Sequence, residues 1–266
     1  MASVAIAGAA PPAARRGRDH RAFEALIVPL VLLALWQIAC TSGLFPPQIL
    51  VPPSDVLREL AALAQTGELQ RHVGESLGRL GLGFAIGGLL GLAFGVALAL
   101  SRWTEAALSP LFLGLWQVPV IAFVPMLVMF LGIEEAFKVT IVAVAAFFPV
   151  ALATFDAIRG IPRAWIEVSR VYRLTLLQLV GRILIPATVP PVLTGLRVAL
   201  TRAWLVLIAA ELLAADSGVG QMMEMGRQLF RIDTVLAGVV VSGIIGFLLD
   251  AGARAVERRA SRWKAA

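Results

Sequence analysis

Three charged residues, Arg197, Arg202 and Glu211, lie in the otherwise apolar stretch LTGLRVALTRAWLVLIAAELL. A charge inside a membrane span costs at least about 2.5–3.5 kcal/mol on insertion scales, so these side chains are expected to face protein or water. Arg202 and Glu211 are nine residues apart, or about 13 Å along a helix, and therefore need partners on other helices. One hypothesis is that Arg197 or Arg202 gives a pathway a positive wall for an anion, since guanidinium matches sulfonate and carboxylate oxygens. The alternative is pairing with other helices or with lipid headgroups.

The chain carries no motif for nucleotide or metal chemistry. A phosphate-binding loop needs G-x-x-x-x-G-K-[ST], but the two lysines, Lys138 and Lys264, do not follow a glycine. The single cysteine, Cys40, excludes an intrachain disulfide, and with two histidines it makes a poor set of metal ligands. We therefore predict no catalytic residue, no metal site and no cofactor on this chain.

Composition indicates an integral membrane protein. Hydrophobic residues make up 59% of the 266 residues, charged residues only 15%, and the mean hydropathy is +0.86, whereas about a quarter of an average soluble domain is charged. The net charge of +6 does not indicate nucleic-acid binding, because the basic residues lie at the ends of apolar runs. The sequence predicts an all-α protein with about six transmembrane helices, near residues 25–45, 76–100, 107–132, 136–158, 187–214 and 234–253.

The distribution of basic residues predicts the orientation. Most of them fall in alternate connections, which places both termini in the cytoplasm by the positive-inside rule, while Arg79 and Lys138 are assigned to the outer side. Residues 1–24 are predicted to be a disordered basic tail, 25–69 the first span with an extracytoplasmic amphipathic segment, 70–254 the main transmembrane domain and 255–266 a second basic tail. The amphipathic segment, capped by Ser54 or Asp55, is expected to lie on the outer membrane surface or to receive a partner.

Two spans have features that predict how they pack. The second span has glycines at intervals of four, which form one face without side chains and predict close helix packing: Gly83, Gly87, Gly91 and Gly95. The third span contains three prolines, each of which removes an amide donor and bends or breaks a helix: Pro110, Pro119 and Pro125. A broken helix is costly in lipid, so the third span either lines a pathway or packs among other helices.

Residues 159–186 form the longest predicted cytoplasmic stretch, in which apolar positions follow a helical period. From spacing alone, this is an interfacial helix pair that either receives a partner protein or lies on the membrane. The stretch resembles the EAA loop of binding-protein-dependent ABC importer permeases, whose pattern is E-A-A, three residues, Gly, nine residues and I-x-L-P. Glu167, Val168 and Ser169 hold the E-A-A positions, and Ile183 and Pro186 hold the end. Arg173 replaces the glycine that normally permits a turn between two short helices.

The resemblance covers about residues 70–260 and is closest to the branch that serves sulfonates, taurine, nitrate and bicarbonate. It is carried by ESLGRLGLGFAIGGLLGLAFG, by VPVIAFVPML and by LIPATVPPVLTGLRVALTRAWLVLIAAELLAADSGVGQMM read from position 184, where Ile185 stands in place of the usual Leu. The segment MFLGI at 129–133 departs from the family, which tends to have Trp-Phe-Gly there.

The resemblance implies a type I ABC importer permease fold in the bacterial inner membrane. A cytoplasmic ATPase subunit, which would bind ATP and Mg, is expected to contact the coupling loop at Glu167, Val168, Ser169, Arg170, Arg173, Ile183 and Pro186. A second permease copy would complete the pathway as a homodimer, and an extracytoplasmic binding protein would deliver the solute. The expected solute is an aliphatic sulfonate or taurine, with nitrate, bicarbonate or a vitamin precursor as alternatives. The rival is an ion-gradient-driven secondary transporter, against which stands the lack of a convincing internal repeat.

Overall fold

The computed structural model describes residues 18–42 and 50–260, which contain helices and turns and no strand. The chain divides into two compact units, Met1–Asp55 and Val56–Ala266. The predicted domain boundary lay at residue 70, later in the chain than this division. The parts of the predicted tails at 1–17 and 261–266 lie outside the described residues.

The described part of the first unit is helix α1, Arg18–Thr41, followed by the start of α2, Pro53–Thr66. Because α1 begins at Arg18, the prediction of disorder was wrong for residues 18–24; Arg, Glu and Ala favour helix there. The predicted cap by Ser54 or Asp55 was also wrong, since α2 begins at Pro53, whose fixed φ suits a first helical position. The Ser54 amide instead donates to Gln37 Oε1 at 3.2 Å, and Gln37 Nε2 donates to Ser54 Oγ at 3.3 Å.

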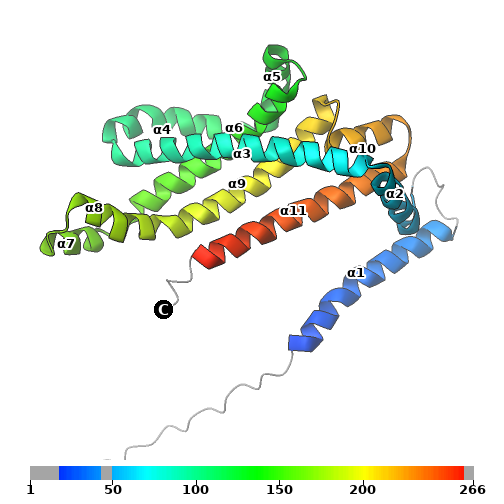
Figure 1. Cartoon of the computed structure of the whole chain (residues 1–266), viewed down its shortest axis with the longest axis horizontal. Coiled ribbons are helices and arrows are strands. Elements are labelled where there is room, and N and C mark those ends of the chain that lie inside the picture. Colours follow the sequence, from blue (N-terminus) through cyan, green and yellow to red (C-terminus); the bar gives the residue numbers. More distant parts are fainter. Residues whose placement is uncertain (1–17, 43–49, 261–266) are drawn as a thin grey trace, which may run out of the picture. The chain divides into compact units, whose positions relative to one another are not determined.

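The second unit is a bundle of long helices with shorter helices at its two ends (Figure 1). Helices α7 and α8 lie at one end and α10 at the other. The elements are α3 Glu68–Leu100, α4 Arg102–Trp116, the 3₁₀ helix η1 Val120–Phe123, α5 Val124–Leu131, α6 Glu135–Arg159, α7 Arg163–Val171, α8 Leu176–Leu179, the π-helix η2 Val180–Leu184, α9 Ile185–Ala214, α10 Val219–Gln228 and α11 Ile232–Ala260.

Four helical stretches in the described residues are long and apolar enough to cross a membrane: Glu68–Leu100, Glu135–Arg159, Leu177–Gln228 and Ile232–Ala260. A fifth span results if α4 and the segment Val120–Leu131 are taken together, although they meet at a 90° bend. The described apolar part of α1, Ile27–Thr41, is shorter. The third predicted span is therefore two helices that meet near Pro119, which removes a helical amide donor there.

Helix α3 begins at Glu68, eight residues before the predicted second span, because its polar first turns find partners inside the protein. Helix α11 likewise continues to Ala260 through the first half of the predicted tail at 255–266. Between α6 and α9, the core contains Phe137, Ile141, Ala203 and Leu207, all of them buried.

The four glycines of the second span lie where α3 packs on α6. A Cβ atom at Gly83 would lie 2.6 Å from Val142 Cβ, and one at Gly91 would lie 2.6 Å from the Phe147 carbonyl oxygen. At Gly87 the nearest atoms belong to the backbone of Ala143, and at Gly95 to Ala151 and Thr154. The absence of side chains at these positions allows the two backbones to approach closely and gain dispersion contacts.

Candidate functional site

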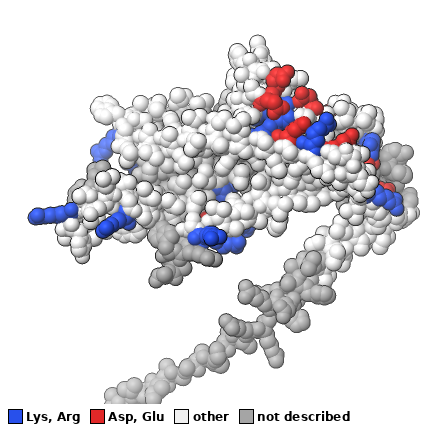
Figure 2. Space-filling model, in the orientation of Figure 1, with Lys and Arg blue, Asp and Glu red and all other residues white. Residues whose placement is uncertain are grey.

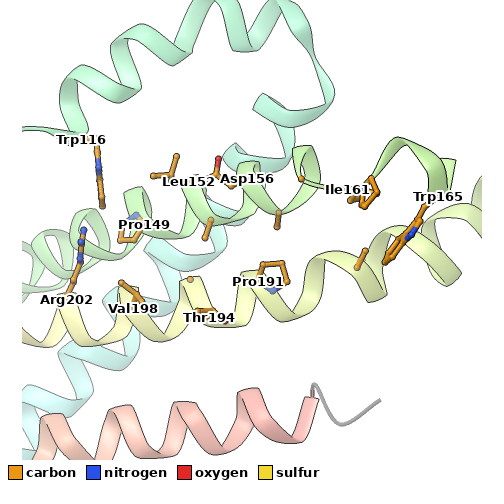
Figure 3. A pocket seen from close by; sticks show the side chains of 16 residues that line it. Trp116, Pro149, Leu152, Asp156, Ile161, Trp165, Pro191, Thr194, Val198 and Arg202 are labelled. Carbon is orange, nitrogen blue, oxygen red and sulfur yellow. The ribbon is translucent and has the colours of Figure 1, made fainter. Parts of the chain in front are cut away.

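A cavity of about 760 Å³ lies between α4, α6, α7 and α9 (Figure 3). Its walls are mostly apolar, with Pro149 and Leu152 on α6 and Pro191 and Val198 on α9. The polar and aromatic lining residues are few: Trp116, Asp156, Trp165, Thr194 and Arg202. An apolar cavity with a small number of polar groups is the usual form of a small-molecule site.

Arg202 lies at the end of the cavity remote from Trp165 (Figure 3). Its guanidinium carbon is 5.1 Å from the centre of the Trp116 ring, a distance at which a cation is attracted to the aromatic face. Trp116 is in turn 6.0 Å from Phe148, and Phe148 is 5.3 Å from Phe112. The last residue of α4 and a packed group of aromatic rings therefore hold Arg202 in place.

Arg197, the other arginine of the same helix, lies outside the cavity. It pairs with two carboxylates of α11, Glu257 at 2.9 Å and Asp250 at 3.6 Å. Of the two arginines that the sequence proposed for a pathway wall, the structure thus places one at the cavity and the other in an inter-helix ion pair.

Glu211 lies in a separate cluster at the far end of the bundle and is 1% exposed. Arg79 on α3 donates to it at 2.8 Å, Ser76 donates at 2.8 and 2.9 Å, and the Gly220 amide donates at 3.0 Å. Arg79 also binds both oxygens of Glu135, at 2.6 and 2.8 Å. The partner that Glu211 needed on another helix is therefore an arginine of the second span.

The same cluster fixes the loop between α9 and α10. Lys138 Nζ, fully buried, lies 2.5 Å from Asp216 and 3.2 Å from Glu135. Arg79 donates to the Ser217 carbonyl at 2.7 Å, and the Gly218 amide donates to His72 Nδ1 at 3.1 Å. We call this set the Arg79 cluster, made of His72, Ser76, Arg79, Glu135, Lys138, Glu211, Asp216 and Ser217.

Sequence reasoning missed the Arg79 cluster because it placed Arg79 and Lys138 at the ends of spans on the outer side. The sequence does contain one signal for such a cluster, because Arg79 and Lys138 each lie next to a long apolar run. Figure 2 shows acidic and basic side chains gathered at this part of the molecule. Near it, Glu59 of α2 accepts from Arg231 at 2.6 Å and from Thr234 at 2.9 Å, and hydrogen bonding to Asp233 raises the pKa of Arg231 above its ordinary value.

The loop at 159–186 exposes Glu167 and Val168 on α7, while Ser169 is buried. The side chain of Arg170 lies outside the described part of the structure. Ile183 lies in η2 and Pro186 in the first turn of α9. This loop therefore carries a short helix with exposed side chains, α7, and connects the ends of two long helices, α6 and α9.

Arg173, two residues after the end of α7, takes the left-handed conformation, with φ of 50°. The Leu174 amide donates to the Ser169 carbonyl at 3.0 Å, the bond that marks a Schellman C-cap. Glycine favours this conformation because it has no Cβ to approach the following carbonyl oxygen. The arginine therefore makes the turn that glycine makes in the resembling pattern.

Replacement of Arg173 with glycine is expected to stabilise this turn by about 1 kcal/mol, because the Cβ strain of a left-handed residue is removed. Amide hydrogen exchange of residues 163–175 should then slow by about fivefold. Arg173→Ala is the matched control, since it removes the same charge and keeps the Cβ atom. Equal exchange in the two variants would show that the side chain, rather than backbone strain, governs the turn.

Apolar spanning helices, a cavity between them and an exposed loop that joins its two walls define a membrane transport subunit. Residues 87–262 match the binding-protein-dependent transport system inner membrane component family, and the chain belongs to this family. It is 35% identical over 241 residues to a putative aliphatic sulfonates transport permease protein of Bacillus subtilis (strain 168), covering 91% of this chain and 87% of that one. It is 34% identical over 238 residues to the taurine transport system permease protein of Escherichia coli (strain K12), covering 88% and 86%.

Solved structures confirm the predicted fold. The inward-facing MetNI methionine ABC transporter matches with a TM-score of 0.61 at 22% identity, over 74% of this chain and 98% of that chain. A bacterial alginate ABC transporter, solved with a periplasmic protein bound to alginate pentasaccharide, matches with a TM-score of 0.62 at 16% identity, over 91% and 95%. The chain therefore has the fold of type I ABC importer permeases.

Proposed function

We propose that this permease subunit imports a small organic anion, an aliphatic sulfonate or taurine, through a pathway that includes the cavity between α6 and α9. The relatives named for aliphatic sulfonate and taurine transport support this substrate class. The observation that carries the proposal is that the exposed loop joins the two helices that form the cavity walls. A displacement of the loop is thereby transmitted to both walls.

We propose three partners for this arrangement. A separate ATPase subunit, which binds ATP and Mg, receives α7 through Glu167 and Val168 on the cytoplasmic side. A second copy of the chain covers the open side of the cavity, and an extracytoplasmic binding protein delivers the solute. Both termini face the cytoplasm. Closure of two ATPases then moves the two α7 helices together and changes the side from which the cavity is accessible.

Coupling through Glu167 has a measurable consequence for growth. A strain that lacks this chain is expected to lose growth on alkanesulfonates or taurine as sole sulfur source and to keep growth on nitrate as sole nitrogen source. The natural chain should restore growth, and Glu167→Lys should not, because reversed charge at the exposed docking helix opposes the ATPase contact.

Glu68→Lys is the matched control for this charge reversal, because Glu68 is also exposed and lies at the start of α3. It should restore growth at equal membrane abundance of the two variants. Growth of the Glu167→Lys strain at the natural rate would contradict the coupling role, and unimpaired growth of the deletion strain on every sulfonate would contradict the substrate class.

A further inference from the structure

We infer that Arg202, held against Trp116, is the specificity-determining residue of the cavity and that it selects an amphiphilic anion whose acidic head binds the guanidinium and whose alkyl chain lies along the apolar wall. This inference rests on the proposed function. It goes further by assigning the head and the chain of the solute to particular residues.

The charge of Arg202 is not neutralised by a carboxylate within the described residues. It contacts the Trp116 ring, whereas Arg197 on the same helix binds two carboxylates and Arg79 binds others. A guanidinium in a membrane-spanning helix is costly unless it finds water or an anion. Arg202 is exposed to the cavity, so the cavity is where a counter-charge can reach it.

The contact with Trp116 places the guanidinium carbon of Arg202 5.1 Å from the centre of the ring and uses none of the guanidinium's hydrogen bonds. Within the described residues, Arg202 makes no hydrogen bond, so its five N–H donors are available for oxygen acceptors. The Phe148 ring packs against Trp116, and the Phe112 ring packs against Phe148. A donor group that is already held in place loses less conformational entropy when it binds an anion.

The rest of the wall suits an alkyl chain better than a small inorganic ion. Pro149, Leu152, Pro191 and Val198 offer carbon surface between the two ends of the cavity. Buried apolar surface contributes to affinity in proportion to its area, and nitrate or bicarbonate has none to offer. The combination of one cation with an apolar wall therefore favours alkanesulfonates.

Asp156 fixes the direction in which such a solute lies. Gly195 of α9 faces Ala153 of α6, and the two helices run in opposite directions (Figure 3). Arg202 is seven residues beyond Gly195 and Asp156 three beyond Ala153, so their Cα levels differ by about 15 Å along the axis. The Asp156 carboxylate repels an acidic head from its end of the cavity. A two-carbon amino-sulfonate is too short to contact both Arg202 and Asp156.

The test uses the full permease–ATPase complex in nanodiscs and compares binding of hexanesulfonate with that of the uncharged hexanesulfonamide. The natural complex should prefer the sulfonate by about tenfold or more, and Arg202→Gln should abolish this preference while both probes still bind. Arg197→Gln, the matched control on the same helix, should keep it. If Arg202 had only a structural role, Arg202→Gln would weaken the binding of both probes equally. A preserved preference for the sulfonate in Arg202→Gln would overturn the inference.

The chain-binding wall is tested by Val198→Phe, which narrows the cavity one helical turn from Arg202. The substitution should weaken the binding of hexanesulfonate by about tenfold and leave the binding of ethanesulfonate nearly unchanged, because only the longer alkyl chain reaches along the wall. Equal effects on the binding of both sulfonates would contradict the assignment of the alkyl chain to the apolar wall. Uptake of sulfonates by the natural importer with its binding protein is measured separately, so a failure of the proposed function is distinguished from a failure of this inference.

Discussion

Replacing Arg79 with alanine is expected to destabilise the folded chain by about 3–5 kcal/mol, the usual cost of breaking a buried ion pair from one side. Glu211, which is almost fully buried, would lose its cation and keep only Ser76 and the Gly220 amide as donors. The loss of the ion pair between Arg79 and Glu135 should contribute less to the destabilisation, because the Glu135 side chain is exposed. The measurement is the free energy of unfolding in detergent, from SDS titration followed by far-UV circular dichroism.

Arg71→Ala is the matched control, since Arg71 lies two turns earlier on the same helix and is exposed. It should change the free energy of unfolding by less than about 0.5 kcal/mol. Adding Glu211→Gln to Arg79→Ala should recover part of the loss, because it removes the uncompensated charge. A single Arg79→Ala variant as stable as the control would show that the buried carboxylate does not depend on this arginine.

The second large effect is expected at the contact between α3 and α6. Gly87→Ala would place a Cβ atom 2.7 Å from the carbonyl carbon and 2.8 Å from the Cα of Ala143. Because these are backbone atoms, they cannot rotate away, and the two helices must move apart. We expect a loss of about 1–3 kcal/mol in the free energy of unfolding, measured in the same SDS titration.

Gly81→Ala tests whether this loss comes from the contact or from the substitution itself. Gly81 lies on the same helix, and nothing approaches within 4 Å of the Cβ atom that alanine would add. Its replacement should be neutral or stabilising by up to about 1 kcal/mol, because alanine is the better helix former. If Gly87→Ala and Gly81→Ala behave alike, the close approach of α3 and α6 does not contribute to stability.

The features that local rules predict are those that depend on residues close in the chain. Glycines four residues apart lie on one helical face wherever the helix packs, so the interface along Gly83 and Gly87 follows from spacing. Proline removes a donor in any surroundings, so a break in the third span also follows, although Pro110 lies inside α4 and the break falls near Pro119. The turn at Arg173 was harder to predict, because an arginine rarely takes a left-handed conformation and the bend depends on the fold around it.

The features that could not be predicted depend on distant partners. Hydropathy patterns identify Lys138 as a polar end of an apolar run and give no sign that Asp216, 78 residues later, covers it. The same holds for Arg202, whose charge was visible in the sequence but whose contact with Trp116 arises only when α4 breaks beside it. For the same reason, the sequence could not separate Arg202 from Arg197 as the arginine at a cavity.

The Arg79 cluster also has a consequence for biosynthesis, because its charges emerge from the ribosome at different times. Glu135 follows Arg79 by 56 residues and Glu211 follows it by 132. At about 5–20 residues per second, the interval between Arg79 and Glu211 is about 7–26 s. During that interval α3 can pair with α6 through Glu135, but the buried half of its contacts is missing until α9 is inserted. A nascent chain interrupted before α9 thus has Arg79 paired with Glu135 alone, and the buried carboxylate of Glu211 is missing from its contacts.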